Sequence, residues 1–492
     1  MKPDPDPKGI FTELDLFFDQ WVVNPIESTF FWDVYFWDNH HPEDLKIPLL
    51  ILWLALGSIF FTFRFGLINI RCFGHAILCL RGKFTSPNEK GEISHAQALS
   101  AALSATVGLG NIAGVAFAVH MGGPGAILWM ILAGFLGMSA KFAECTLGQK
   151  YRITREDGHL SGGPMHYLAE GLSELGLARL GKVLATIFSI LCVGASFGGG
   201  NMFQANQAYA QVSGAIPFLS GNIGSALFGL LLAFAVGLVI IGGIKRIGEV
   251  AGILVPFMCG IYFLAGAIVL LANSSEIQKA LEIILRSALG PEAAAWGGGT
   301  AVLIQGFRRA AFSNEAGVGS APIAHSAATT NEPIREGLVA LLEPFIDTVI
   351  ICTMTGLVIV VTGAYLQEDL SGGILMTSWA FNTVIPGFDI VLSVTAVLFA
   401  YSTMISWSYY GEQCWANLLG SSTIRIYKVL FLLCVLLGSV ISARAVLDFG
   451  DLMLLGMAFP NIIGVCLLSG KVKKDLDAYL YRFKNGDFVS KN

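Results

Sequence analysis

The sequence predicts an all-α polytopic membrane protein, because it is rich in apolar residues, poor in charge and apolar in long runs. Of its 492 residues, 54% are hydrophobic and 13% are charged, and the mean hydropathy is +0.67. Soluble domains contain about 25% charged residues, so this depletion indicates that lipid surrounds most of the chain. Apolar runs recur over the whole length, which favours one polytopic domain over a soluble domain with an anchor.

Composition and motifs exclude several other classes of protein. The net charge is −5, the pI is near 5.9, and no basic stripe suited to nucleic acid occurs. The nine cysteines are scattered, without a CxxC pair or metal-ligand spacing, and the histidines are expected in loops or at helix caps. No HExxH motif supports a metal-dependent intramembrane hydrolase, so we expect that the protein is not an enzyme.

Eleven membrane-spanning helices are predicted, each long enough for a hydrocarbon core of about 30 Å. They cover residues 47–68, 97–121, 124–148, 183–212, 223–243, 250–272, 298–327, 337–363, 387–416, 424–443 and 447–470. The acidic, aromatic residues 1–46 are expected outside the cytoplasm, either at the membrane interface or as a solvated tail. The chain then divides into an extra helix with its loop, two five-helix repeats and a cytoplasmic tail, at 47–96, 97–272, 298–470 and 471–492.

The charge of the loops predicts the orientation of the helices. Lysine and arginine gather in alternate loops and in the C-terminal tail, whereas loops 213–222 and 364–386 contain neither residue. The alternate loops that are rich in basic residues contain, among others, Arg71, Lys83, Lys150, Arg152, Arg155, Lys245, Arg246, Arg335, Arg425 and Lys428. Because positive loops stay in the cytoplasm, we expect the N-terminus outside and the C-terminus inside.

Two glycine-rich interruptions predict discontinuous helices at 97–121 and 298–327. The first contains Gly108–Ala113 and the second contains Gly317–Ala324. Five predicted helices begin with each interruption, and because five is odd, the second set enters the membrane from the opposite side. Interrupted helices at matching positions of inverted repeats are typical of a transporter binding site. Tight helix packing through small residues is the alternative.

Each predicted interruption exposes backbone groups that can bind a ligand. The N-terminus of a half-helix suits a carboxylate, and the carbonyl end of the other half suits a hard cation such as Na⁺. In the first interruption the candidates are Thr106, Gly108, Gly110 and Asn111. In the second, the break is expected at 312–317, with Ser313 and Asn314 as polar liners.

Two further segments carry unusual polar residues for a membrane helix. Phe203 and Gln204, within an amide-rich run, are candidates to face a substrate, with interhelical hydrogen bonding as the alternative for the other amides. Ser402 and Thr403 are candidates for a Na⁺ shell, unless both hydroxyls bind backbone carbonyls of their own helix. Trp407 lies one turn beyond Thr403 and can wall a small pocket.

Several charged residues inside these segments have two interpretations. Glu315 either binds a proton or cation or pairs with Arg308 or Arg309, and these arginines form either a gate or a structural ion pair. Asp347 and Glu343 are each either a proton site or part of a buried ion pair.

Long motifs in the same order resemble the alanine or glycine:cation symporter family, over about residues 47–470. The resemblance is strongest in Ala102–Ala116, Phe312–Pro322 and Trp407–Glu412. It implies a LeuT-type five-plus-five inverted repeat with one extra N-terminal helix, in agreement with the eleven predicted helices. It also implies Na⁺-driven uptake of alanine and often glycine.

The resemblance implies a role for each matching residue. Thr106, Gly108 and Gly110 would meet the substrate carboxylate. The amine and the small side chain would be framed by Phe203, Gln204, Ser313, Asn314 and Trp407. The Val107 carbonyl, Ser402 and Thr403 resemble one LeuT sodium site, and Asn111 matches a ligand of the other.

We therefore expect a sodium-coupled symporter of a small neutral amino acid in the cytoplasmic (inner) membrane, with a proton-coupled amino-acid symporter as the alternative. A channel would need a filter repeated by symmetry, which one inverted repeat does not supply. The expected ligands are alanine or glycine and co-transported Na⁺, and the expected surroundings are the lipid bilayer. Neither nucleic acid nor an obligate protein partner is indicated.

Overall fold

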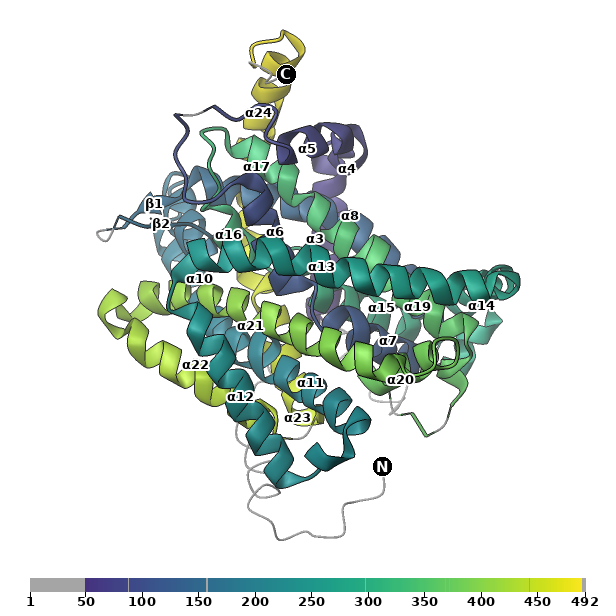
Figure 1. Cartoon of the computed structure of the whole chain (residues 1–492). Helices are drawn as coiled ribbons and strands as arrows, with labels where there is room; N and C mark the ends of the chain where they lie inside the picture. The colour runs from purple at the N-terminus through teal and green to yellow at the C-terminus, as the bar shows by residue number, and fades with distance from the viewer. Residues whose placement is uncertain are drawn as a thin grey trace, which may run out of the picture.

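A computed structural model describes residues 49–488, apart from 87, 156–157, 297, 368, 371 and 442. The predicted acidic segment 1–46 lies outside the described residues. The described chain is mostly helical, with one short antiparallel hairpin of β1 (Ile153–Thr154) and β2 (Leu160–Ser161) (Figure 1).

Eight helical segments of the described chain are long and apolar enough to cross a membrane. They comprise α8 (Ala126–Lys150), α10–η4–α11 (Ala178–Phe197, Gly198–Met202, Phe203–Ala215), α12 (Asn222–Ile240), α13 (Gly243–Ala272), α17–α18–η8–α19 (Pro333–Ala340, Leu342–Pro344, Phe345–Cys352, Thr353–Val361), α21 (Phe388–Leu419), η10–α22 (Ser421–Thr423, Ile424–Gly438) and α23–α24 (Ala443–Gly456, Ala458–Lys484). The fold is thus that of a polytopic membrane protein.

Three shorter or interrupted elements complete the predicted set. They are α3 (Leu49–Arg64), the bent pair α6 (His95–Thr106) and η2–α7 (Gly110–Gly114, Val115–Gly122), and the pair α15 (Gly298–Asn314) and α16 (Ala321–His325). The bent pair counts as a ninth crossing, with a bend of 51°. Every predicted helix range overlaps an observed helix, but the count of eleven crossings stays a prediction, because α3 and α15 are short.

Several short elements lie where the sequence predicts loops. They are α4 (Ile68–Arg71), α5 (Phe73–Leu80), α9 (Pro164–His166), η3 (Tyr167–Gly171), η5 (Pro217–Leu219), η6 (Ser274–Glu276), α14 (Ile277–Leu289), η7 (Pro291–Trp296), η9 (Ala364–Leu366) and α20 (Ile374–Asn382). Helix α24 also continues to Lys484, whereas its crossing was predicted to end at 470. Most of the predicted tail is therefore helical.

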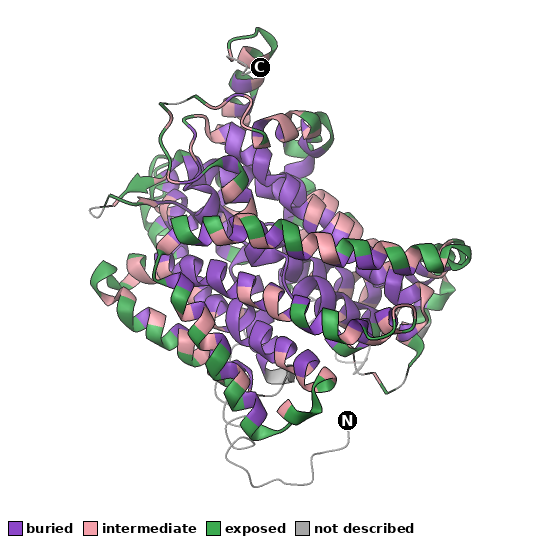
Figure 2. Cartoon of the chain, in the orientation of Figure 1, coloured by how far each residue is buried: buried purple, intermediate pink, exposed green. Residues whose placement is uncertain are grey.

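The helices form a buried centre and an outer shell (Figure 2). In α8, 67% of the most apolar window is buried inside the protein, against 22% in the segment Ser421–Gly438. The outer helices α12, α13 and α22 expose large apolar side chains such as Phe234 and Ile253. Such outward apolar faces suit contact with lipid, so the polar chemistry lies on the central helices α6, α8, α15 and α21.

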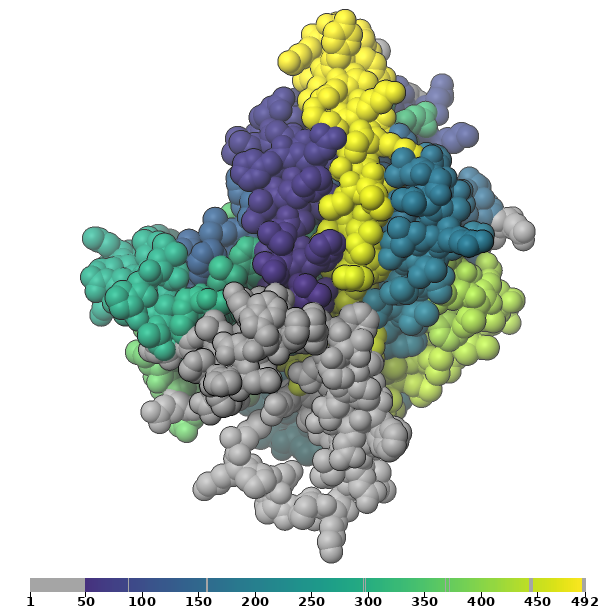
Figure 3. All heavy atoms as spheres, turned by 180° about the vertical axis from the view of Figure 1, so that it is seen from behind, coloured from purple at the N-terminus to yellow at the C-terminus, as the bar shows by residue number. Residues whose placement is uncertain are grey.

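The face seen from behind shows how the ends of the described chain pack together (Figure 3). Helix α24 lies between the N-terminal elements α3–α5 on one side and α10 on the other. The most N-terminal and the most C-terminal described helices therefore pack side by side, outside the central helices.

Candidate functional site

The first helix break lies at Val107–Leu109, between α6 and η2. Helix α6 begins with a capping box, in which Ser94 Oγ accepts from Gln97 N and Gln97 Oε1 accepts from Ser94 N. At its other end, Gly108 N donates to Asn111 Oδ1 at 3.0 Å, and Leu109 N donates to Gln204 Oε1 at 3.1 Å. Unpaired amides are costly in lipid, so these side-chain oxygens stabilise the break. The same amides are suited to bind a carboxylate.

Helix α21 packs polar groups against this break. Thr403 Oγ1 donates to Ser104 O at 3.0 Å, and Ser104 Oγ donates to Ser402 O at 2.7 Å. A Cβ atom on Gly108 would lie 2.4 Å from Thr403 Oγ1, so the approach of the two helices requires glycine there. The Ser402 hydroxyl donates to Phe399 O in its own helix at 2.9 Å. Of the two predicted Na⁺ hydroxyls, Thr403 thus contacts the broken helix directly.

Two other predicted residues of the first break differ in what they expose. The Thr106 hydroxyl donates to Ala102 O, four residues back, at 3.2 Å, which is common for threonine in helices. The Thr106 hydroxyl is therefore bonded within its own helix, so the backbone of Thr106, not its side chain, is the candidate to contact a ligand. A Cβ atom on Gly110 would lie 3.6 Å from the Cα of Ser313, so the first break contacts the end of α15.

A buried carboxylate links the two broken helices. Asp347, in η8, accepts from Asn111 Nδ2 at 2.6 Å, from Ser313 Oγ at 2.9 Å and from Thr348 Oγ1 at 2.7 Å. Among the described residues Asp347 forms no ion pair. The sequence raised Asp347 as a proton site but did not place it beside Asn111 and Ser313. The sequence signal that pointed to Asp347 was an acidic residue within an apolar segment.

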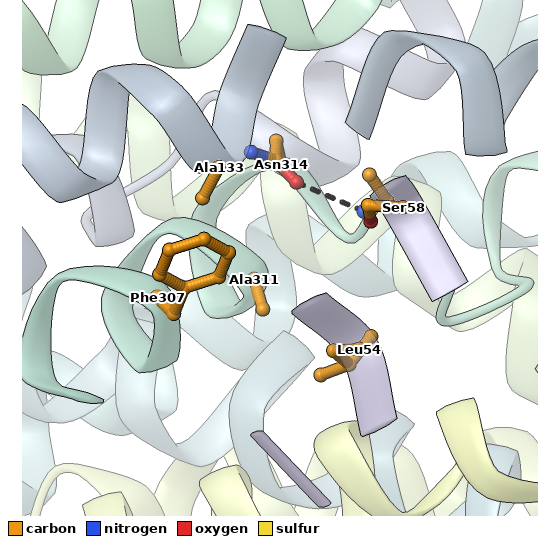
Figure 4. Close-up of a pocket in the computed structure, with 7 residues that line it drawn as sticks. Leu54, Ser58, Ala133, Phe307, Ala311 and Asn314 are labelled. Carbon is orange, nitrogen blue, oxygen red and sulfur yellow. Dashed lines mark hydrogen bonds between the residues drawn. The ribbon is translucent and has the colours of Figure 1, made fainter. Parts of the chain in front are cut away.

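Asn314 is connected to this carboxylate through Thr348. Its Nδ2 donates to Thr348 Oγ1 at 2.9 Å, and its Oδ1 accepts from Ala316 N at 2.9 Å. Figure 4 shows Asn314 beside a small hollow between α3 and α15, with Ser58 and Phe307 also on its wall. Asn314 therefore caps the end of α15 and faces α3, not the first break.

The second break lies at 315–320, between α15 and α16. It begins three residues later than predicted, because α15 stays helical through Asn314. Glu315 is buried and has a left-handed backbone, with φ of 55°. Its carboxylate accepts from Trp407 Nε1 at 3.1 Å and from Ser320 Oγ. The Gly317 carbonyl accepts from Asn461 Nδ2 at 2.9 Å. The second break thus contains a carboxyl group where the first contains amides.

Aromatic side chains lie between the two breaks. The rings of Phe203 and Phe312 meet edge to face, with centroids 5.3 Å apart. Trp407 packs against the π-helical turn η4, where a Cβ atom on Gly200 would lie 2.2 Å from its Cγ. The predicted residues Phe203 and Trp407 therefore both lie beside the broken helices, as do Gln204 and Ser313.

Several other buried charges form ion pairs, whereas the buried Glu144 accepts a hydrogen bond from Asn461 Nδ2. Arg308 Nε donates to Asp451 at 2.8 Å, and Arg309 also binds Asp451, so neither of these contacts involves Glu315. Lys141 binds Glu343 at 3.0 Å. His95 and His325 lie at helix ends, as expected, but both are buried and both contact Glu336. For the two arginines and Glu343, the structure shows the ion pairs that the sequence offered as alternatives.

Comparison with known proteins identifies the family of this chain. Residues 39–491 match the family described as the sodium:alanine symporter family. The sodium/alanine symporter AgcS of Methanococcus maripaludis is 41% identical over 438 residues, which cover 88% of this chain and 94% of AgcS.

Other relatives carry different names. The probable sodium/glutamine symporter GlnT of Bacillus subtilis is 34% identical, with 89% of each chain covered. The putative sodium/proton-dependent alanine carrier protein YrbD of the same organism is 31% identical, with 89% of this chain and 91% of YrbD covered. This chain belongs to the sodium:alanine symporter family and is a multi-pass amino-acid transporter, not an enzyme.

Proposed function

We propose that this chain takes up a small neutral amino acid, alanine and/or glycine, together with Na⁺, by alternating access in the cytoplasmic (inner) membrane. The observation that carries the proposal is the contact between the two helix breaks through Asn111, Asp347 and Ser313. One ligand bound there would touch both discontinuous helices, so its binding can be coupled to their movement.

The amino acid is assigned to the space where the first break meets the aromatic residues. The amides of Gly108 and Leu109 donate to the substrate carboxylate in place of Asn111 Oδ1 and Gln204 Oε1. Trp407 and Phe203 limit the size of the substrate side chain. Support comes from the name of AgcS, a sodium/alanine symporter.

Sodium, the co-transported ion, is assigned to hard oxygen ligands around the same break. The Val107 carbonyl and the hydroxyls of Ser402 and Thr403 form the first candidate set. Thr403 already contacts the broken helix, whereas Ser402 has to turn away from Phe399 O. Asn111, with Asp347 beside it, forms a second candidate set. Each net positive charge that enters gains about 2.3 kcal/mol per 100 mV of membrane potential.

The proposed architecture has eleven crossings. Helix α3 precedes two inverted repeats of five, which begin at α6 and at α15. The N-terminus lies outside and the C-terminus in the cytoplasm. The matching positions of the two breaks and the distribution of basic loops support this arrangement.

Uptake of labelled alanine into proteoliposomes tests the coupling ion. An inward Na⁺ gradient without a pH gradient should drive accumulation, and a K⁺-diffusion potential, negative inside, should increase it. An inward H⁺ gradient without Na⁺ should not. Accumulation driven by H⁺ alone would contradict the sodium assignment.

Proton coupling is the second candidate, because the buried carboxylates of Asp347 and Glu315 accept hydrogen bonds from uncharged donors. Among the described residues, neither Asp347 nor Glu315 forms an ion pair, and an isolated ionised carboxylate is costly in a membrane. Protonation would remove this cost, as would a bound Na⁺. The same liposome experiment separates the two ions.

A further inference from the structure

The loops that leave the two broken helices pair with each other at one end of the protein. Ile93, before α6, and Ala328, after α16, form a parallel bridge. Glu92 N donates to Ala327 O at 2.8 Å, and Thr329 N donates to Ile93 O at 2.8 Å. Figure 1 shows α6, α16 and the β1–β2 hairpin near one another at this end. The start of α6 and the end of α16 are therefore held together by backbone hydrogen bonds between their adjoining loops.

Arg152, directly after α8, joins these two loops. Its Nη1 donates to Ser326 O and Ala328 O, both at 2.8 Å. Its Nη2 donates to Lys90 O at 2.9 Å and to Thr330 O at 2.8 Å. The planar guanidinium spreads its donors in a fork, so one side chain can bind carbonyls from both loops at once.

Gln149 adds to this arrangement from the last turn of α8. Its Nε2 donates to His325 O at 2.5 Å and to Ala328 O at 3.2 Å. His325 ends α16, so these bonds act where the second discontinuous helix ends. Both clamping side chains come from the same end of α8, which is a long, mostly buried helix.

A cavity of about 200 Å³ lies beside this clamp. Its lining includes Glu92 from the first loop, Arg155 from the hairpin, and Gln413 from α21. Arg155 binds Gln413 and Ser421, and Glu92 accepts from Leu160 N, so the hairpin connects the clamped loops to the end of α21. The cavity is therefore large enough to admit several water molecules beside the clamped loops.

The chemistry of the clamp suits reversible opening. Arg152 is partly exposed and its four acceptors are backbone carbonyls, which water can solvate once the guanidinium leaves. In contrast, separating the buried pair Lys141–Glu343 would leave two uncompensated charges. The clamp is therefore the element at this end that can open and close at low cost.

We propose that Arg152 is a gate residue, whose guanidinium holds the cytoplasmic ends of both discontinuous helices closed until transport requires release. This inference rests on the alternating access and orientation proposed above. Release of the amino acid into the cytoplasm then requires Arg152 to leave the carbonyls of the 326–330 loop. Arg152 acts on the position of the helices and does not touch the substrate.

The test compares Arg152→Lys with Arg482→Lys in the full-length protein in proteoliposomes. Lysine keeps the charge at 152 but loses the fork. Arg482 binds Glu332, two residues beyond Thr330, with two hydrogen bonds at 2.8 and 2.7 Å, and it contacts none of the four carbonyls that Arg152 binds. It therefore controls for the loss of a bidentate arginine.

Two readouts distinguish a gate from a structural role. Hydrogen–deuterium exchange, measured without substrate, should accelerate in Arg152→Lys at the amides of Glu92 and Thr329. The half-saturating external alanine concentration should rise about tenfold if the outward-facing fraction falls to about a tenth. Arg482→Lys should change neither quantity.

Unchanged exchange and unchanged half-saturation in Arg152→Lys would overturn the gate. A lower maximal rate with unchanged half-saturation and exchange would also overturn it, because that pattern indicates loss of folded protein only. Failure of the wild-type protein to transport alanine would instead contradict the proposed function, and the exchange readout would still report on the clamp.

Discussion

The two helix breaks have opposite chemical character. The first, at Val107–Leu109, is neutral, and its amides are bound by the side-chain oxygens of Asn111 and Gln204. The second, at 315–320, places the carboxylate of Glu315 in a left-handed turn and binds it to Trp407 and Ser320. The two breaks are therefore not copies of one binding site. In the proposed function, the first break binds the substrate carboxylate.

The same contrast extends to their partners. The first break contacts α21 through hydroxyls and a glycine, whereas the α15 end contacts η8 through Asp347. Asp347 also binds Asn111, directly after the first break, so this carboxylate lies between the two broken helices.

Replacement of Gly108 by alanine should have the strongest effect. The new Cβ would lie 2.4 Å from Thr403 Oγ1 and 3.1 Å from Gln204 Oε1, so the first break and α21 must separate. Overpacking of this kind costs about 1–3 kcal/mol, and we expect alanine uptake to be abolished. Gly114→Ala is the matched control, since a Cβ there meets nothing within 4 Å. Equal uptake by both variants would contradict the role of Gly108.

Replacement of Asp347 by asparagine should have the next strongest effect. Asn111 and Ser313 would lose bonds to a charged acceptor, each worth about 1.5–3 kcal/mol. We expect uptake to fall at least about tenfold and the dependence on the coupling ion to weaken. Asp389→Asn, in the first turn of α21, is the control. An unchanged ion dependence in the Asp347 variant would exclude Asp347 from the ion site.

Removal of the Trp407–Glu315 hydrogen bond should have a moderate effect. Trp407→Phe removes the Nε1 donor, while Glu315→Gln keeps an acceptor and removes the charge. If the bond positions the indole, the two changes should be non-additive by about 0.5–3 kcal/mol in uptake efficiency. A double-mutant cycle on the half-saturating alanine concentration measures this coupling. Strict additivity would show that the two side chains act independently.

Replacement of Ser402 by alanine should have the smallest effect on folding. Among the described residues, its hydroxyl contacts only Phe399 O of its own helix and Met258 Sδ. We expect thermal stability without Na⁺ to change by less than about 0.5 kcal/mol. Stabilisation by added Na⁺ should nevertheless decrease if Ser402 turns to bind the ion. Thr403→Val, which also loses the bond to Ser104 O, should be less stable even without Na⁺.

The sequence was sufficient to locate the first break but not the exact start of the second. Two glycines within an apolar run are a local signal, and the break occurs between them. Ser313 and Asn314 appeared to be part of the second break, but the Asn314 side chain binds Ala316 N and α15 continues through it. A helix end of this kind depends on a side-chain orientation that residue type does not determine.

Contacts between distant segments were the least predictable part of the site. Asp347 meets Asn111 across 236 positions, and Arg309 meets Asp451 across 142. Residue spacing carries no information on such pairs, because they depend on how the helices pack. The short helix α14 was also missed, since it is amphipathic and lacks the long apolar run that predicts a membrane-spanning helix.

The reciprocal effect of Na⁺ and alanine on each other's binding tests the shared site most directly. Equilibrium binding of labelled alanine to the purified protein should be measured with Na⁺ and with an inert cation, and Na⁺ binding with and without alanine. If both ligands bind at the joined breaks, Na⁺ should tighten alanine binding, and alanine should tighten Na⁺ binding by the same factor. Alanine affinity that does not depend on Na⁺ would contradict the account.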